Sequence, residues 1–293
     1  MKTALLGARG YWGQKIEKRL RENNFYELIA TIDPHGGDFS FWEDFKKSDL
    51  FDQTELVCIF TPPDSHTHLT EDSIKNNKHV ICAKPFVSSE REVAALYDLA
   101  KKNNVALLLD YTFAHNSAIH KLKELLPLIG APKLLVSRRM NFGKYQDFGT
   151  ITDLLPHDIS IANFLFGDLS GKAYVSQNSA IYKQDFAHVF IKNGSPDLDL
   201  TFSWSCPIKD RELFVVGELG ILRVGWDKNQ IELTKIEKHQ IVETRCFIYE
   251  NKDALDTEFK VFSSAFVNNS FSVIMNKQQI TSELMCKFIE ACK

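Results

Sequence analysis

The N-terminal third of the chain alternates between short, uninterrupted apolar runs and longer stretches in which apolar residues recur with helical spacing. An apolar run without alternation is typical of a strand buried on both faces, as in a parallel sheet. Strands that alternate with helices are joined by right-handed crossovers, so helices cover the sheet. The pattern predicts a doubly wound parallel sheet with a helix that Ser88 caps at 88–104, and strands at 3–6, 27–32, 56–60, 79–82 and 105–109.

The pattern is different in the second half of the chain. Residues 133–140 alternate as a strand, residues 152–166 have the spacing of a helix, and short alternating runs dominate from 171 to 248. Alternating strands are typical of an antiparallel sheet that buries one face and leaves the other to solvent or a partner.

We therefore expect an α/β protein of two domains. Residues 1–115 are predicted to form a dinucleotide-binding Rossmann domain with a doubly wound parallel sheet. Residues 116–293 are predicted to form an α+β domain, with an open, mainly antiparallel sheet, for substrate binding and oligomerisation. An exposed apolar face usually marks a partner surface, and closed symmetry covers it most simply. We expect a homodimer or homotetramer, because aromatic residues are interleaved along these strands, among them Phe186, Phe190, Phe202 and Trp204.

Composition excludes several classes of partner. The 293 residues are 44% apolar and 25% charged, and the net charge of −3 favours neither a nucleic-acid binder nor a basic membrane surface. No apolar run approaches a membrane span, and the N-terminus has no secretory signal pattern. Six scattered cysteines indicate reduced thiols, so we expect a cytoplasmic protein. We expect no metal, because no carboxylate or cysteine cluster joins the His66-x-His68 pair.

A glycine-rich turn follows the first strand and precedes a helix: Gly7-Ala8-Arg9-Gly10-Tyr11-Trp12-Gly13. In this context, glycines let the backbone approach a pyrophosphate at the helix N-terminus. The spacing is looser than G-x-G-x-x-G, so the turn alone fits a simple tight turn equally well.

The second predicted strand ends at Asp33, 20 residues after Gly13. A carboxylate there can accept hydrogen bonds from the adenosine ribose, which favours NAD over NADP. Arg9 leaves NADP open, because a nearby arginine can receive a 2′-phosphate. Asp33 could also simply start a turn before Pro34, but the glycine-rich turn favours the ribose contact.

Four motifs, in this order, resemble the Gfo/Idh/MocA family, the group of glucose–fructose oxidoreductase and inositol dehydrogenase. They are the glycine-rich turn, Thr61-Pro62-Pro63-Asp64-Ser65-His66, Asn77-Lys78-His79-Val80-Ile81-Cys82-Ala83-Lys84-Pro85, and Asp153 with His157. The resemblance covers nearly the whole chain. It implies a Rossmann domain that binds NAD(P) through Gly7, Arg9, Gly10, Tyr11, Trp12, Gly13, Asp33, Thr61, Pro62, His66, Lys84 and Pro85.

Other motifs resemble the branch of this family associated with nucleotide sugars and surface polysaccharides. They are Gly10-Tyr11-Trp12-Gly13, Tyr111-Thr112-Phe113 before Asn116, Arg139-x-Asn141-x-Gly143, and Asp153-Leu154-x-Pro156-His157-Asp158. The chain departs from the family in two respects. Ala83 replaces the glutamate that usually precedes Lys-Pro, and the C-terminal part is shorter than in most relatives.

Hydride transfer at a secondary alcohol requires a proton carrier and a positive charge near the oxygen. Lys84 follows a parallel strand, where doubly wound sheets bind ligands, although it could be a solvated lysine. His157 comes four residues after Asp153, so on a helix the two share a face, and a carboxylate orients an imidazole. If Pro156 opened the helix, Asp153 would be only a cap.

We assign catalysis to Lys84, His157 and Asp153, and substrate binding to Lys84, Tyr111, Arg139, Asn141 and His157. An arginine suits a carboxylate or phosphate, but Arg139 and Asn141 could instead belong to an ion pair on the sheet. Asp158 is expected to be structural.

The sequence thus predicts an NAD(P)-dependent dehydrogenase or reductase. Its substrate would be a ring hydroxyl or ketone of a sugar, in either direction, with a nucleotide sugar of glycan or surface-polysaccharide biosynthesis favoured. One alternative is a catalytically weak, dinucleotide-binding regulator, which Ala83 and the short C-terminal part would allow. Another is an enzyme like biliverdin reductase, which Lys84-Pro85 disfavours.

Overall fold

The computed structural model describes residues 1–86, 89–142, 149–167 and 169–291, so Ser88 and Gly143 lie outside the described residues. The chain divides into two compact units. The first joins Met1–Asp110 to Glu258–Glu283, and the second joins Tyr111–Thr257 to Leu284–Lys293. The segment Glu258–Glu283 thus lies in the first unit, whereas the sequence suggested the second domain for it.

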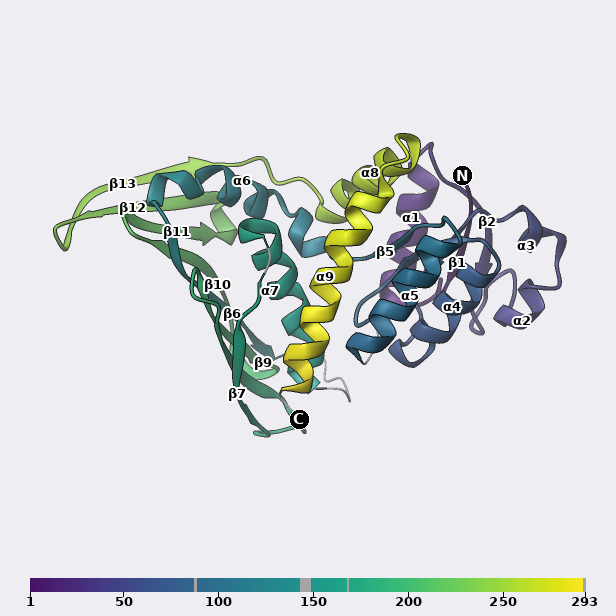
Figure 1. The fold of residues 1–293 in the computed structure, drawn as a ribbon, viewed down its shortest axis with the longest axis horizontal. Helices are drawn as coiled ribbons and strands as arrows, with labels where there is room; N and C mark the ends of the chain where they lie inside the picture. Colours follow the sequence, from purple (N-terminus) through teal and green to yellow (C-terminus); the bar gives the residue numbers. More distant parts are fainter. Residues whose placement is uncertain (87–88, 143–148, 168, 292–293) are drawn as a thin grey trace. The chain divides into compact units, whose positions relative to one another are not determined.

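The first unit is built on a five-stranded, wholly parallel sheet in the order β2-β1-β3-β4-β5 (Figure 1). The side chains of Leu56–Ile59 and of Leu107–Leu109 are completely buried. Apolar runs without alternation therefore do mark strands covered on both faces. The prediction of a Rossmann-type parallel sheet is confirmed, with strands β1 (Lys2–Leu6), β2 (Glu27–Ile32), β3 (Leu56–Ile59), β4 (His79–Cys82) and β5 (Leu107–Leu109).

Helices connect these strands. Helix α5 begins at Glu90, and its cap is Ser89, whose Oγ accepts the backbone N–H of Glu92 at 3.3 Å. The cap therefore lies one residue beyond the predicted Ser88. The connecting helices are α1 (Tyr11–Glu22), α2 (Trp42–Phe45), α3 (Asp49–Gln53), α4 (His66–Lys75) and α5 (Glu90–Lys102).

Residues from two late helices, α8 (Ala254–Val267) and α9 (Phe271–Glu290), complete the first unit. The amide of Gln278 binds the backbone of Leu109, accepting its N–H at 2.8 Å and donating to its carbonyl oxygen at 2.7 Å. Strand β5 is at the edge of the sheet, where backbone groups lack a neighbouring strand. Gln278 supplies the missing partners through a contact that joins residues far apart in the sequence.

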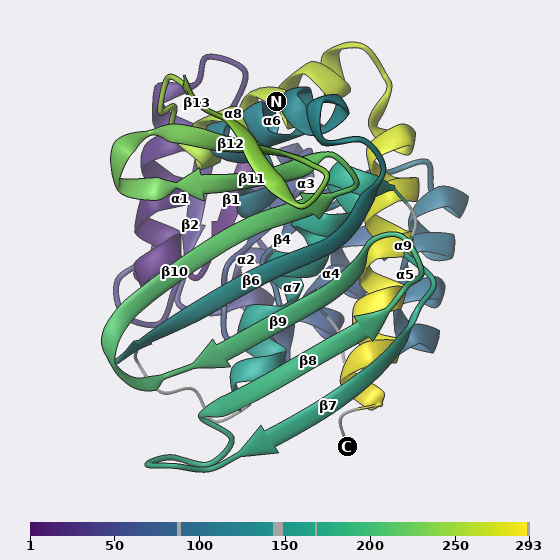
Figure 2. The same ribbon diagram turned by 90° about the vertical axis from the view of Figure 1, so that its left-hand side faces the viewer.

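The second unit contains an eight-stranded sheet in the order β13-β12-β11-β10-β6-β9-β8-β7 (Figure 2). Among the described strands of this second sheet, only β6 and β9 pair in parallel, so the prediction of a mainly antiparallel sheet is confirmed. The strands are β6 (Pro132–Phe142), β7 (Lys172–Asn178), β8 (Phe186–Lys192), β9 (Asp197–Ser203), β10 (Ser205–Gly217), β11 (Gly220–Gly225), β12 (Gln230–Glu237) and β13 (Gln240–Ile248).

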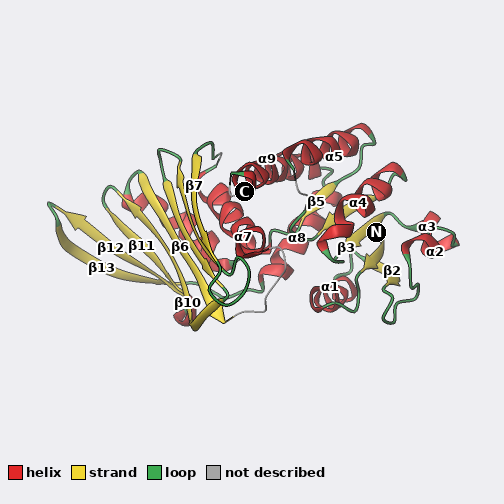
Figure 3. Ribbon diagram, turned by 90° about the horizontal axis from the view of Figure 1, so that it is seen from below, coloured by secondary structure: helices red, strands yellow, loops and turns green. Residues whose placement is uncertain are grey.

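Two helices, α6 (Ser117–Leu125) and α7 (Gly149–Phe166), cover one face of this sheet (Figures 2 and 3). Helix α7 begins three residues before the predicted residue 152 and continues through Pro156. None of the helices in the described residues combines the length and apolar character that a membrane crossing requires.

The helix-covered face of the sheet is the buried one. Phe202 and Trp204 are 0% and 3% exposed, so these two aromatic residues do not contribute to an exposed face. The sequence predicted aromatic residues on the outer face as a group, without assigning each one. Phe186 and Phe190 are half-buried. Alternation could not make this distinction, because it separates two faces without saying which one the helices cover.

Candidate functional site

The glycine-rich turn brings the backbone of the first unit into close contact with itself. Gly7 has φ +80°, and a Cβ atom on it would lie 2.4 Å from the carbonyl oxygen of Phe60. A Cβ atom on Gly13 would lie 1.9 Å from the carbonyl oxygen of Gly7. Helix α1 starts within this motif, at Tyr11, and its first turn contains no acidic residue. Its positive N-terminal end is therefore suited to a pyrophosphate.

A cavity of about 550 Å³ lies beside this turn, within the first unit. Its volume is in the usual range for a small-molecule site. The sequence-predicted residues Gly7, Arg9, Gly10, Asp33, Thr61 and Pro62 line it. The residues present thus fit the nucleotide part of NAD. The lining that the sequence missed comes mainly from the segment after β2 and includes Pro34, His35, Ser40, Phe41 and Trp42.

Phe41 and Trp42 supply the aromatic surface of this cavity. Trp42 is 8% exposed, whereas Phe41 is 61% exposed beside it. The indole Nε1 of Trp42 donates to Asp72 at 2.6 Å, which holds the ring in place. The aromatic run Phe39-Ser40-Phe41-Trp42 was the signal in the sequence that could have indicated a surface for a flat base.

Asp33 and Arg9 are held by their own surroundings. The carboxylate of Asp33 accepts the backbone N–H groups of Arg9 and His35, both at 2.8 Å. The guanidinium of Arg9 donates to the carbonyl oxygen of Gly36 at 2.9 Å and pairs with Glu17 at 3.2 Å. Arg9, the arginine that could bind a 2′-phosphate, is therefore already paired with the carboxylate of Glu17.

Tyr11 and Trp12 lie at the start of α1 and are exposed by 71% and 43%. The ammonium of Lys15 lies over both rings, 4.3 Å from the centroid of Tyr11 and 4.8 Å from that of Trp12. The lining of the cavity includes neither ring. The two residues thus form a cationic aromatic surface at the helix N-terminus.

His66 is 1% exposed and bridges two loops. Its Nδ1 lies 2.8 Å from the carbonyl oxygen of Pro85, and its Nε2 lies 2.8 Å from that of Thr61. A carbonyl accepts but cannot donate, so both ring nitrogens must carry hydrogen. Burial opposes this charge, but Cys82 and the two carbonyls outweigh it and raise the pKa of His66 from 6.5 to about 9. Lys84, half-buried after β4, precedes Pro85 through a cis peptide bond.

In the second unit, Asp153 and His157 are four residues apart within α7, so they share one side of the helix. Both are half-buried. Because the helix starts at Gly149, Asp153 belongs to the helix body and is not its cap. The ring of His157 lies 4.3 Å from that of Phe113, which belongs to the 3-10 turn η2 (Thr112–His115).

Arg139 is bound to Asp158 in the interior. Its Nε lies 2.9 and 3.0 Å from the two carboxylate oxygens, and the side chains are 7% and 0% exposed. Ser137 also donates to Asp158, at 3.0 Å. The guanidinium of Arg139 further lies 4.5 Å from the ring centroid of Phe113. Arg139 thus ties β6 to α7, in the ion-pair arrangement that the sequence left open.

The other two predicted substrate residues lie differently. Asn141 is exposed, two residues beyond Arg139 on the same face of β6. Tyr111 is 5% exposed, and its hydroxyl lies 3.7 Å from the Sδ of Met285. The aromatic ring of Tyr111 is therefore part of the interior of the second unit.

Arg211 was missed by the sequence analysis. It is directly opposite Arg139 in the register of β10 and β6, and its guanidinium lies 5.6 Å from the ring centroid of Phe113. It is exposed and makes no ion pair within the described residues. Desolvation and then the positive charge of Arg139 lower the pKa of Arg211, while Asp158 opposes the shift. The signal was the shared alternation of Lys209 and Arg211 with the buried Leu213.

The comparisons with known proteins address both units. Residues 1–111 match the family model GFO_IDH_MocA, described as an oxidoreductase family with an NAD-binding Rossmann fold. Oxidoreductase P35 of Formosa agariphila is 24% identical over 224 residues, 69% of this chain and 67% of the relative. Other curated relatives match over about half of their own length or less.

Solved structures resemble the chain over nearly its whole length. UDP-N-acetylglucosamine 3-dehydrogenase GnnA from Acidithiobacillus ferrooxidans has a TM-score of 0.81 at 20% identity, covering 99% of this chain and 98% of that one. KijD10 from Actinomadura kijaniata, a 3-ketoreductase in complex with TDP-benzene and NADP, has a TM-score of 0.82 at 13% identity, covering 98% and 96%. At these identities the similarity shows the fold. The family match to residues 1–111, with this fold, confirms the resemblance noted in the motifs.

Proposed function

We propose, from the match of residues 1–111 to an oxidoreductase family with an NAD-binding Rossmann fold, that the chain oxidises or reduces a ring carbon of a nucleotide-linked sugar. The observation that carries the proposal is the cluster of His157, Phe113 and Arg211 on the helix-covered side of the second unit. It places a proton carrier near an arginine that makes no ion pair within the described residues. The described functions of GnnA and KijD10, a UDP-sugar dehydrogenase and a 3-ketoreductase, support the substrate class.

Residues of the second unit transfer the proton in this proposal. A bound NAD supplies or accepts the hydride. In the oxidative direction, His157 takes the hydroxyl proton at a ring nitrogen, and in the reductive direction it returns that proton to the oxygen. Asp153, one helical turn earlier, favours the protonated imidazole that forms. The resemblance in the motifs also assigns catalysis to Lys84 of the first unit, whose positive charge suits a developing oxyanion.

The cofactor preference follows from the first unit. Asp33 presents a carboxylate to the cavity, and Glu17 already pairs with Arg9. The 2′-phosphate of NADP would be repelled by the carboxylate of Asp33, and it would compete with the carboxylate of Glu17 for Arg9. We therefore propose NAD as the cofactor in use.

The test is the formation or loss of NADH with a panel of UDP-, GDP- and dTDP-sugars, in both directions. Turnover with a linked sugar, lost in His157→Ala, is the expected result. Tight NADH binding without turnover of any sugar would contradict the proposal and favour a dinucleotide-binding regulator.

A further inference from the structure

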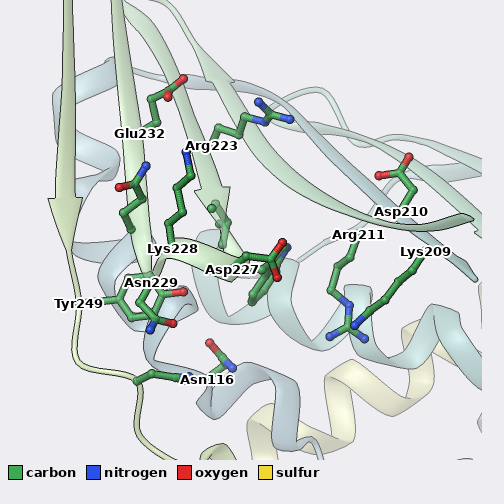
Figure 4. A pocket seen from close by; sticks show the side chains of 15 residues that line it. Asn116, Lys209, Asp210, Arg211, Arg223, Asp227, Lys228, Asn229, Glu232 and Tyr249 are labelled. Atoms are coloured by element: carbon green, nitrogen blue, oxygen red, sulfur yellow. The ribbon is translucent and has the colours of Figure 1, made fainter.

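A polar cavity of about 570 Å³ lies within the second unit, apart from the cavity of the glycine-rich turn (Figure 4). Strand β10, the turn between β11 and β12, the chain after β13 and the start of α6 form its walls. Its polar lining includes Asn116, Lys209, Arg211, Arg223, Asn229 and Tyr249, together with the charged residues Asp210, Asp227, Lys228 and Glu232.

Two cations lie next to each other on the β10 wall of this cavity. Lys209 and Arg211 project from β10 toward each other (Figure 4). Both are exposed, and neither has an ion pair within the described parts of the chain. Arg223, by contrast, pairs with Glu212 at 2.9 Å. Two adjacent cations without a carboxylate repel each other, so an anion between them would be stabilised.

Arg211 differs from the neighbouring Arg139 in its ion pairing. The two arginines are opposite each other across β6 and β10, and both guanidinium groups lie against the ring of Phe113. Asp158 balances the charge of Arg139 at 2.8 Å. Arg211 makes no such ion pair within the described residues, although the two arginines are opposite each other in the strand register. This difference indicates that Arg211 binds a ligand rather than holding the fold together.

A chain of contacts joins this cavity to the proton carrier. Arg211 lines the cavity and contacts Phe113, and the ring of Phe113 lies 4.3 Å from that of His157. A substrate that reacts at His157 and extends past Arg211 would reach the cavity. It would carry its negative charge at a distance from the reacting carbon.

The far side of the cavity mixes neutral polar groups with the charged Asp227 and Lys228, which lie next to Asn229 in the chain. Asn116, Asn229 and Tyr249 face it from three different segments (Figure 4). Amide groups donate and accept hydrogen bonds, and a tyrosine offers both a ring face and a hydroxyl. This combination suits the sugar and base of a nucleoside.

We propose that the cavity binds the nucleoside diphosphate of the substrate, with Lys209 and Arg211 holding the diphosphate. The inference rests on the proposed function in that His157 acts on the attached sugar. Arginine binds phosphate oxygens in a bidentate manner and lysine acts as a point charge, so the pair suits two adjacent phosphates. Because Arg211 also contacts Phe113, it would set the distance between the diphosphate and the reacting carbon.

Calorimetric titration tests this with UDP, GDP and dTDP as probes. The protein is first saturated with NADH, so that a probe cannot bind at the dinucleotide site. At least one diphosphate should bind, and its nucleoside without phosphate should bind much more weakly. Arg211→Gln and Lys209→Gln should each weaken binding of that diphosphate by about 10- to 100-fold, as expected for charge-assisted hydrogen bonds. Arg138→Gln is the matched control, because Arg138 lies on the opposite face of β6 and pairs with Glu212.

The outcomes separate this inference from the proposed function. If no diphosphate binds the NADH-saturated protein, or if Arg211→Gln binds it as tightly as the parent, the inference is overturned, even where a free sugar is oxidised. If the diphosphate binds through Arg211 and no linked sugar turns over, the proposed function fails and the nucleotide site stands. With an active substrate, Arg211→Gln should raise KM more than it lowers kcat. Circular dichroism and retained NADH binding show whether each variant is folded. If Arg211→Gln does not fold, the effect of Lys209→Gln on diphosphate binding decides whether the inference holds.

Discussion

The imidazole of His66 donates to the carbonyl oxygen of Pro85 at 2.8 Å, one residue beyond Lys84. Its other nitrogen donates to Thr61, also at 2.8 Å, on the wall of the dinucleotide cavity. The sequence suggested that His66 binds the cofactor. The ring is 1% exposed, so its role in the structure is to hold together two loops that carry proposed cofactor and catalytic residues.

This arrangement predicts a pH-dependent stability. The pKa of His66 is raised from 6.5 to about 9 in the folded state, so the folded protein holds the proton more tightly than the unfolded chain. The protonated His66 should therefore add to the free energy of unfolding, by an amount on the order of 3 kcal/mol. This stabilisation should be complete below pH 6.5 and lost as the pH rises through 9. Urea unfolding across this window should show the loss in the parent and a much smaller one in His66→Gln. Equal losses in the two proteins would contradict the assignment.

The catalytic roles predict large losses of turnover. Lys84→Ala and His157→Ala should each lower kcat by about 100- to 10,000-fold, because each removes a group that acts mainly in the transition state. NADH binding should change little in His157→Ala. His68→Ala, at an exposed histidine outside the proposed site, is the control. A His157→Ala protein that turns over like the parent at every pH would refute proton transfer by His157.

The cofactor preference can be changed at a single ion pair. We expect the parent to bind NADH more tightly than NADPH. Glu17→Gln should strengthen NADPH binding, because it releases the guanidinium of Arg9. Arg21→Gln removes the other partner of Glu17 and should leave the preference unchanged. Fluorescence titration of Trp12 and the other tryptophans measures both affinities. Tighter binding of NADPH by the parent, by tenfold or more, would mean that Arg9 already serves as a phosphate ligand.

The buried pair of Arg139 and Asp158 predicts a stability effect. Asp158→Ala should lower the free energy of unfolding by about 3–5 kcal/mol, because it leaves a guanidinium buried without its partner. Glu124→Ala, which breaks an exposed pair with Lys121, should cost about 1 kcal/mol or less. Chemical denaturation compares the two. A similar small loss in both would show that water reaches Arg139.

We also predict a homo-oligomer formed through the uncovered face of the eight-stranded sheet. The strand register places Tyr174, Phe190, Asp199, Val136 and Phe214 in one row across this face, so four of these five positions are apolar or aromatic. Phe190→Arg should dissociate the assembly, whereas Val267→Arg, at an exposed position of α8, should not. Light scattering gives the mass, and the mass of one 33.5 kDa chain for the parent at micromolar concentration would refute the oligomer.

The sequence by itself determined the architecture of both sheets. Apolar runs such as 56–60 are typical of strands covered on both faces, and the alternation from 171 to 248 is typical of a sheet with two different faces. The glycine-rich turn and Asp33 were recognisable for the same reason. Local steric and hydrogen-bonding requirements act over a few residues, and each leaves its mark in the local sequence.

Only the tertiary structure decided which charged groups pair and which remain available to a ligand. Arg139 and Arg211 are both arginines on alternating strands, and nothing in either segment distinguishes them. Asp158 reaches the first because α7 crosses β6, and the register of β10 leaves the second beside a cavity. The attachment of Gln278 to β5 is a similar case. Such contacts depend on the packing of segments far apart in the chain, and a pattern of neighbouring residues does not encode that packing.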